Sequence, residues 1–327
     1  MKPFTYVVPK DLAEAAAAAR EPDTVLKGAG IDLVDRMKER LQTPQQVVNL
    51  LPLKQQLAGV ARTADGALQI GALTTLAELE QHAELAAPAL QALRQSAGMT
   101  ATPQVRNRAT VAGNILQFTR CWYVRSEAFR CLHGGRGPTC LAVTGENRYH
   151  AVLGWMDCVR VHPSNLAPPL LALGAEYTTT LDGTTRRRAL AELFPEEPRA
   201  QNPEHTLQAG EIVTALHVPK QPDGARSAYC ESREKQTFDW ATTACAVRVV
   251  LQGGKITAAD LVLGAVAPNP LPRPKAAAAL VGQAPSTALF QKAAELAFAG
   301  ANPLAHNDYK LTIGKAVVRQ ALEEATR

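Results

Sequence analysis

Cysteines gather in one part of this sequence. Six are present, and four of them, Cys121, Cys131, Cys140 and Cys158, lie within residues 121–158. Thiolates bind soft metals, so this group indicates a metal site. The spacing, Cys-x9-Cys-x8-Cys-x17-Cys, contains no Cys-x2-Cys pair and alone favours neither a zinc ribbon nor a ferredoxin. A [4Fe-4S] cluster needs four thiolates and can be wrapped by a long irregular loop. The alternative is four reduced thiols in that loop.

The residues around these cysteines bear on the two interpretations. Four arginines would offset the negative charge of a thiolate-bound cluster: Arg120, Arg125, Arg130 and Arg136. The other two cysteines, Cys230 and Cys245, lie in strand-like segments, where we interpret them as small buried apolar side chains. Three histidines could approach the site, although each is more simply a structural histidine: His133, His150 and His162.

A glycine-containing loop is the second feature that could bind a ligand. Residues 27–33 read Lys-Gly-Ala-Gly-Ile-Asp-Leu and follow a short apolar strand. Small residues there let a ligand approach the backbone, and successive N–H groups can point at phosphate oxygens. The loop lacks the third glycine of a dinucleotide-binding fingerprint and is not a P-loop. A plain tight turn is the alternative.

A second segment of small and polar residues supports the ligand-binding interpretation of the first loop. Residues 102–116 include Thr110 and Asn114, which supply short polar side chains, and Ala112 and Gly113, which leave the backbone accessible. Two such loops could clamp a diphosphate from opposite sides. A polar strand and turn without a ligand is the alternative.

Alternating helix and strand patterns surround these loops. Asp11 predicts an N-capped helix, and the hairpin turn Asp182-Gly183 follows a strand. The other expected strands are 24–27, 46–50, 68–72, 175–181, 242–251 and 255–266, and the other expected helices are 75–82, 88–97, 165–173, 286–298 and 307–325. This order favours an α/β or α+β fold. Residues 118–160 have little periodicity and form a long, functional loop.

Composition excludes several function classes. The chain has 327 residues, a net charge of +5 and 5% aromatic residues, which does not fit a dedicated nucleic-acid binder. No apolar run is long enough to span a membrane, and the first residues lack a signal-peptide core. We therefore expect a cytoplasmic protein, or a periplasmic one if a signal-bearing partner carries it across the membrane.

The two loops, in this order and separation, resemble the FAD-binding subunits of the xanthine dehydrogenase family of molybdenum hydroxylases. A third family segment, Ser-Asp-Leu-Ala-Pro, has its counterpart in residues 164–168, Ser-Asn-Leu-Ala-Pro. The resemblance covers almost the whole chain. It implies an α+β fold with a two-part FAD-binding domain of the PCMH/vanillyl-alcohol-oxidase type at residues 1–219. A smaller α+β domain of the CO dehydrogenase flavoprotein type would follow at 220–327.

Within that family, the inserted cysteine loop resembles the flavin subunits of periplasmic aldehyde oxidoreductases and, more distantly, of 4-hydroxybenzoyl-CoA reductase. The resemblance implies a [4Fe-4S] cluster on the four clustered cysteines. It also implies that Arg233 to Trp240 approach the flavin ring. The residues that it assigns to FAD are Lys27, Gly28, Ala29, Gly30, Ile31, Asp32, Leu33, Ala109, Thr110, Gly113, Asn114, Leu116, Ser164, Asn165 and Leu166.

The implied function is electron transfer. Substrate oxidation would take place at a molybdenum cofactor on a large partner subunit. Electrons would pass through [2Fe-2S] clusters on a small subunit to the FAD here, and then to an external acceptor. The resemblance assigns no catalytic side chain to this chain. Two alternatives are a stand-alone FAD oxidoreductase of the same fold and a metal-stapled scaffold without redox activity.

Some residues depart from the family pattern. Ala29 and Ala112 replace glycines, which is a small steric change. Asn165 replaces the usual Asp and removes a negative charge near the cofactor, while Glu231 stands where relatives often have Lys. These changes leave FAD binding as the expectation and alter the predicted charge around the flavin.

Overall fold

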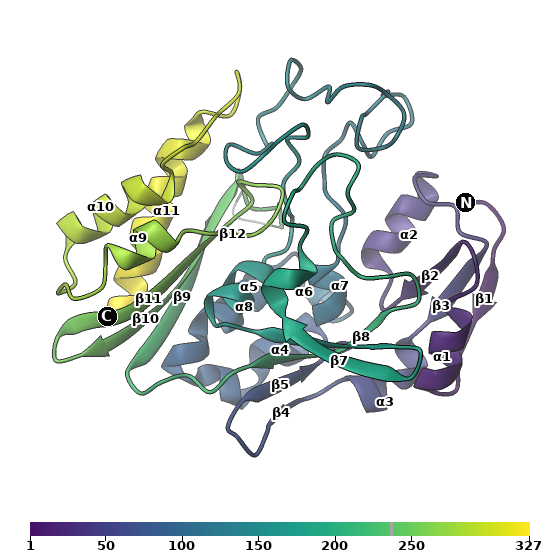
Figure 1. The fold of residues 1–327 in the computed structure, drawn as a ribbon, viewed down its shortest axis with the longest axis horizontal. Coiled ribbons are helices and arrows are strands. Elements are labelled where there is room, and N and C mark those ends of the chain that lie inside the picture. Colours follow the sequence, from purple (N-terminus) through teal and green to yellow (C-terminus); the bar gives the residue numbers. More distant parts are fainter. Residues whose placement is uncertain (236–237) are drawn as a thin grey trace.

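The computed structural model describes residues 1–235 and 238–327, and three sheets organise them (Figure 1). The N-terminal sheet has three parallel strands in the order β1-β3-β2. Helix α1 packs on one face, where Ala15 and Ala16 meet Val48, and α2 packs on the other, where Leu33 and Met37 meet Val47. Its elements are β1 (Thr5–Val7), α1 (Leu12–Ala18), β2 (Thr24–Lys27), α2 (Ile31–Lys38) and β3 (Gln46–Asn49).

The central sheet has five antiparallel strands in the order β4-β5-β8-β6-β7. They are β4 (Val60–Arg62), β5 (Leu68–Gly71), β6 (Glu176–Leu181), β7 (Thr184–Ala189) and β8 (Ile212–Val218). Leucines from the sheet and its helices form one buried core, including Leu68, Leu93, Leu166 and Leu216. The helices are α3 (Lys54–Leu57), α4 (Leu76–Gln81), α5 (Gln91–Met99), α6 (Pro103–Arg106), α7 (Val111–Ile115) and α8 (Ala167–Ala172), with 3-10 turns at Leu51–Leu53, Ala83–Ala86, Pro88–Leu90 and Leu190–Leu193.

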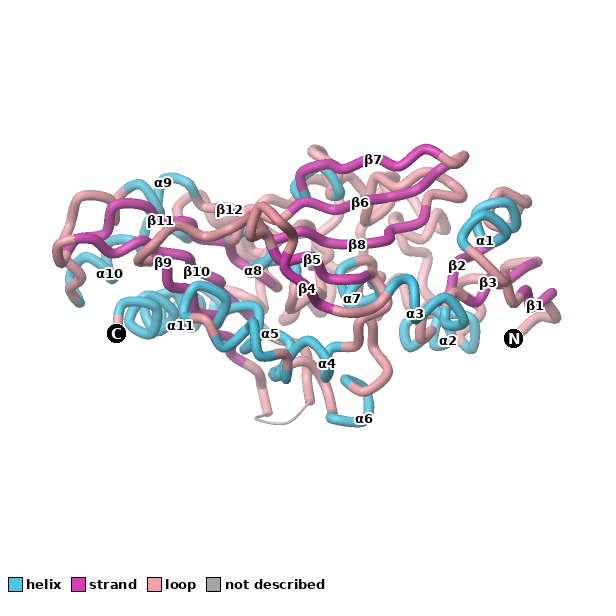
Figure 2. The backbone as a smooth tube through the Cα atoms, turned by 90° about the horizontal axis from the view of Figure 1, so that it is seen from below, coloured by secondary structure: helices cyan, strands magenta, loops and turns pink. Residues whose placement is uncertain are grey.

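The C-terminal sheet has four strands in the order β12-β11-β10-β9. Alternate residues face opposite sides: Cys245 and Val247 of β10 face the long helix α11, and Ala244 and Ala246 face α5 and α8 of the central part. This sheet therefore has both faces covered (Figure 2). The elements are β9 (Ala225–Ser232), β10 (Thr243–Gln252), β11 (Lys255–Gly264), β12 (Leu271–Pro272), α9 (Pro274–Ala278), α10 (Thr287–Ala297) and α11 (Tyr309–Thr326).

A long irregular segment joins α7 to α8. In the described chain, no helix or strand lies between Ile115 and Ala167. We call residues 118–160 the cysteine loop, and Figure 1 shows it above the sheets, between α11 and α2.

Most predicted elements are confirmed. Asp11 caps α1, Ser286 caps α10, and the Asp182-Gly183 turn joins β6 to β7. The second small-residue segment forms the short helices α6 and α7, which differs from the strand and turn considered as the alternative. Helix α2 was not predicted, and it begins inside the first loop. The boundary between residues 219 and 220 stays a prediction. No described helix has the length and apolarity that a membrane crossing requires.

Candidate cofactor-binding site

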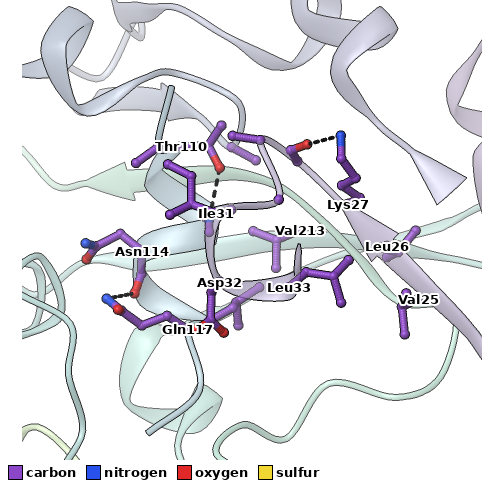
Figure 3. A pocket seen from close by; sticks show the side chains of 18 of the residues that line it. Val25, Leu26, Lys27, Ile31, Asp32, Leu33, Thr110, Asn114, Gln117 and Val213 are labelled. Carbon is purple, nitrogen blue, oxygen red and sulfur yellow. Dashed lines mark hydrogen bonds between the residues drawn. The ribbon is translucent and has the colours of Figure 1, made fainter. Parts of the chain in front are cut away.

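A cavity of about 710 Å³ lies where the N-terminal sheet meets the central sheet (Figure 3). Both predicted loops line it, including every residue from Lys27 to Leu33. The opposite wall carries Ala109, Thr110, Gly113, Asn114 and Leu116. Residues 207–213, which no sequence motif indicated, also line the cavity, and so do residues 238–240 of the stretch expected to approach the flavin.

The first loop presents free backbone donors to this cavity. Chain reversal occurs at Gly30, whose φ of 82° places it in the left-handed region, and α2 begins at the next residue. No described protein atom accepts a hydrogen bond from the N–H groups of residues 28–33. The first amides of a helix lack intrahelical acceptors and attract anions. This edge of the cavity therefore fits a diphosphate.

The Lys27 side chain contacts the first loop and the neighbouring strand. Its Nζ lies 3.3 Å from both the Gly28 carbonyl oxygen and Asn49 Oδ1, and 5.7 Å from the centre of the Tyr6 ring. A Cβ atom on Gly30 would lie 2.9 Å from Lys27 Cε. The loop conformation therefore favours glycine at position 30 because of its φ, and a side chain there would displace the flexible Lys27 side chain.

The second loop differs in how it uses its amides. Val111 N–H donates to Thr74 O, Ala112 N–H to Ala72 O, and Gly113 N–H to Thr110 Oγ1 at 3.1 Å. These donors hold α7 in place and are not free for a ligand. Because a Cβ on Gly28 would lie 3.2 Å from Thr110 Oγ1, glycine also lets the two loops approach closely.

Among the polar residues of this wall, which include Thr110 and Gln117, Asn114 is the one held by the third family segment. Its Oδ1 accepts from Ser164 Oγ at 2.6 Å and from Leu166 N–H at 3.3 Å. Ser164 and Leu166, predicted beside the flavin, thus lie behind the lining and orient Asn114. Of the predicted third segment, only Asn165 lines the cavity.

Asn165 is held by a buried carboxylate. Its Nδ2 donates to Glu231 Oε2 at 2.6 Å, and Tyr229 OH donates to the same oxygen at 2.5 Å. Arg233 forms an ion pair with the other oxygen of Glu231. The sequence indicated that replacing Asp by Asn removes a negative charge at position 165. The structure places the Glu231 carboxylate immediately behind Asn165, where Arg233 pairs with it.

Asp32 connects the cavity to the cysteine loop. Its carboxylate receives Phe118 N–H at 3.0 Å and pairs with Arg120 at 3.0 Å and Arg125 at 2.7 Å. Burial alone would raise the pKa of Asp32, but the charge of Arg120, the Phe118 N–H and two further arginines outweigh it and lower that pKa. The guanidinium of Arg120 also lies over the Trp240 ring, 4.7 Å from its centre.

The four clustered cysteines meet in the cysteine loop without forming a site for a single metal ion. The neighbouring Cys158 thiol lowers the pKa of Cys140 to about 6, and the Cys140 thiol and burial raise the pKa of Cys158. Burial raises the pKa of Cys121 to about 12, and the charges of Cys131 and Cys140 add to the effect. Among the described residues, no three His, Cys, Asp or Glu side chains are grouped to hold one ion.

The remaining predictions for single residues can be placed. Cys230 and Cys245 are buried and oppose each other across β9 and β10. His133 contacts Glu204 at 2.9 Å, and His162 packs on Phe194. Of the expected flavin-facing stretch 233–240, Phe238, Asp239 and Trp240 line the cavity, while residues 236 and 237 lie outside the described residues.

Comparison with known proteins identifies the family. The FAD binding domain in molybdopterin dehydrogenase matches residues 2–221, and the CO dehydrogenase flavoprotein C-terminal domain matches residues 227–325. The aldehyde oxidoreductase FAD-binding subunit PaoB of Escherichia coli (strain K12) is 33% identical over 99% of each chain. This chain belongs to the FAD-binding subunits of the molybdenum hydroxylases.

Two further relatives confirm the family fold. The carbon monoxide dehydrogenase medium chain of Hydrogenophaga pseudoflava is 27% identical over 98% of this chain and 96% of its own length. A crystal structure of the Cu,Mo-CO dehydrogenase in its cyanide-inactivated form has a TM-score of 0.77 and 26% identity, and covers 100% of this chain and 99% of its own. The predicted α+β fold and FAD-subunit function are confirmed. The stand-alone oxidoreductase and the scaffold are not favoured.

Proposed function

We propose that this subunit binds FAD with its diphosphate on the amides of residues 28–33, and that it transfers electrons within an aldehyde-oxidising enzyme. The observation that carries the site is the run of N–H groups from Gly28 to Leu33 without a described protein acceptor. Such a run of donors at a helix start binds anions. Bound FAD supplies the redox chemistry, and the protein supplies its position and surroundings.

The proposed roles of the cavity residues follow from their contacts. Lys27 neutralises charge beside the diphosphate, and Asn114 donates to it from the opposite wall. Because Asn165 Nδ2 is held by Glu231, its Oδ1 is the atom available to accept from the flavin ring. Ser164 and Leu166 act through Asn114. The remaining assigned residues supply backbone amides or contact surface: Gly28, Ala29, Gly30, Ile31, Asp32, Leu33, Ala109, Thr110, Gly113 and Leu116.

The proposed substrate class and partners rest on the similarity to PaoB. We infer that a large subunit with a molybdenum cofactor oxidises an aldehyde, and that a small subunit with [2Fe-2S] clusters relays the electrons to this chain. An external acceptor then receives them. In this scheme no side chain of the present subunit acts as nucleophile or base on the aldehyde.

The substrate test uses the complex purified with its neighbouring subunits. Under anaerobic conditions, an aromatic aldehyde should bleach the flavin absorbance within one turnover. Carbon monoxide and a purine, tested in parallel, should leave it unchanged. Bleaching by one of these two and not by the aldehyde would replace the proposed substrate class.

We further propose that Cys121, Cys131, Cys140 and Cys158 hold a [4Fe-4S] cluster. In support, Cys121, Cys131 and Cys140 pack in one cluster of the cysteine loop, and the Cys158 thiol shifts the pKa of its neighbour Cys140. A four-iron cluster binds each thiolate at a separate iron atom, so it does not need the close convergence that one ion requires. Arg120 and Arg125, expected to offset the charge of the cluster, pair with Asp32 at the start of the loop.

The cluster test compares two cysteine variants. Cys121→Ser should remove the iron, whereas Cys245→Ala, at a buried cysteine of β10 outside the loop, should retain it. Iron is measured per chain together with the broad absorbance at about 400 nm that iron–sulfur clusters show. Equal iron in both variants would refute the ligand assignment, and zinc in place of iron would favour a structural metal.

A further inference from the structure

The start of helix α11 reaches from the C-terminal domain into the cysteine loop. Asn307 Nδ2 donates to the carbonyl oxygens of His150 and Ala151, both at 3.2 Å. The backbone N–H of His306 donates to Asn147 Oδ1 at 2.9 Å. Lys310, one turn further along, donates to the same part of the loop. Residues 306–310 therefore fix the loop around residues 147–151.

Lys310 is the central residue of this contact. Its side chain is completely buried, and its Nζ donates to the carbonyl oxygens of Tyr149 at 3.1 Å, His150 at 3.0 Å and Ala265 at 2.9 Å. Three carbonyls use all three donors of an ammonium group. No described carboxylate pairs with Lys310, and burial alone shifts its pKa. Since burying an ammonium is costly, an apolar residue would be the easier way to fill this space. We infer that a buried lysine is kept here because its three hydrogen bonds hold the backbone of the cysteine loop in position.

The side chain that this contact positions is His150. Its Nε2 lies 3.1 Å from Cys121 Sγ, and its ring packs edge-on against Trp122 with 5.2 Å between ring centres. The backbone of His150 is fixed on both sides, because its N–H donates to Asn147 O and its carbonyl accepts from Asn307 and Lys310. His150 is 3% exposed, so water does not compete for the contact with sulfur.

We propose that His150 donates a hydrogen bond to the Cys121 sulfur, and that Lys310 is the positioning residue that holds His150 there. The inference rests on the proposed iron–sulfur cluster and adds to it a role for the C-terminal domain. Hydrogen bonds to cluster sulfurs stabilise the more negative, reduced state and so raise the reduction potential. The C-terminal domain would thereby tune a cluster whose ligands all lie in the N-terminal part of the chain.

The test measures the cluster potential in the full complex by a redox titration followed by electron paramagnetic resonance. His150→Phe keeps an aromatic ring of similar size and removes the donor, and His150→Gln places an amide donor near the position of Nε2. We expect His150→Phe to retain iron and FAD and to titrate at a lower potential. His150→Gln should recover part of that shift.

Lys310→Met is tested alone and together with His150→Phe. If Lys310 acts through His150, the Lys310→Met substitution should lower the potential in the wild-type background. It should cause no further change in the His150→Phe background. A lowered potential in both backgrounds would assign Lys310 a role independent of His150 and overturn its positioning role. FAD content shows in each variant that the chain has folded.

The outcomes separate this inference from the proposed function. Wild-type protein with FAD but without iron would overturn both the cluster and this inference. Wild-type iron together with an unchanged potential in His150→Phe would overturn the inference alone. Loss of iron in His150→Phe would overturn it as well, because His150 would then be needed for cluster assembly rather than for tuning.

Discussion

The substitution Asn114→Asp tests the FAD site with little change in shape. Asn114 is 5% exposed, and its Oδ1 accepts from both Ser164 Oγ and Leu166 N–H. No described protein atom accepts a hydrogen bond from its Nδ2, so this group is the donor available on the cavity wall. Aspartate keeps the accepting oxygen and both of its bonds, but it replaces the free donor by a charged oxygen.

The expected loss can be worked from these contacts. A hydrogen bond to a charged phosphate oxygen contributes about 1.5–3 kcal/mol. A carboxylate about 4 Å from a phosphate charge adds repulsion of roughly 4 kcal/mol at an effective dielectric constant of about 20. Partial protonation and solvent reduce the sum, so we take about 2 kcal/mol as the minimum. This corresponds to roughly 30-fold weaker FAD binding.

The assay is the dissociation constant of FAD, measured by flavin fluorescence after reconstitution of the apoprotein. Ser164→Ala is the matched control, because it removes one donor to the same Asn114 oxygen and leaves Nδ2 in place. We expect it to weaken binding by less than about 5-fold, since one buried hydrogen bond contributes about 1 kcal/mol. Binding by Asn114→Asp within about 3-fold of wild type would show that Asn114 does not face the diphosphate.

Three further predictions test the surroundings of the site. Gly30→Val should lose FAD. Gly282→Val is the control, because it has the same φ of 82° and no atom within 4 Å of an added Cβ, and it should lose only stability. Equal loss of FAD in both variants would contradict this prediction. Burial lowers the pKa of Lys310 to about 7, so the unfolded chain binds more protons above pH 7. Wild-type stability in urea should therefore gain about 2 kcal/mol relative to Lys310→Met between about pH 7 and pH 9, and parallel curves would refute it. Asp32 has a lowered pKa, so its stabilisation should be lost as the pH falls through that folded-state pKa; Asp32→Asn should lack this acid-dependent loss in thermal unfolding.

Helix caps and turn residues predicted the elements whose ends depend on neighbouring residues in the sequence. Asp11 and Ser286 cap their helices through side-chain oxygens, and the Asp182-Gly183 turn has positive φ at both residues. Helix α2 escaped prediction because its start lies within a loop interpreted as a phosphate-binding turn. The helix is part of that same feature, since its first amides are the free donors.

The cavity was only partly predictable for a related reason. Residues 207–213 enter its wall because β8 pairs between β5 and β6, a pairing between segments far apart in sequence. Ser164 and Leu166 were assigned to the flavin from their motif, and the structure places them behind Asn114. A motif therefore locates a site without distinguishing the residues of its surface from those that support it.

Asp32 gives the two proposed sites a common structural origin. Its N–H is one of the free amides of the first loop, while its carboxylate binds Phe118, Arg120 and Arg125 at the start of the cysteine loop. The position of α2 relative to the cavity thus depends on how the cysteine loop begins. If the loop were displaced, the Asp32 carboxylate would lose Arg120, Arg125 and the Phe118 N–H, and Arg36 of α2 would remain as its ion-pair partner. Because a less neutralised carboxylate at the start of α2 would repel a diphosphate, the contacts of Asp32 couple order in the cysteine loop to the proposed FAD site.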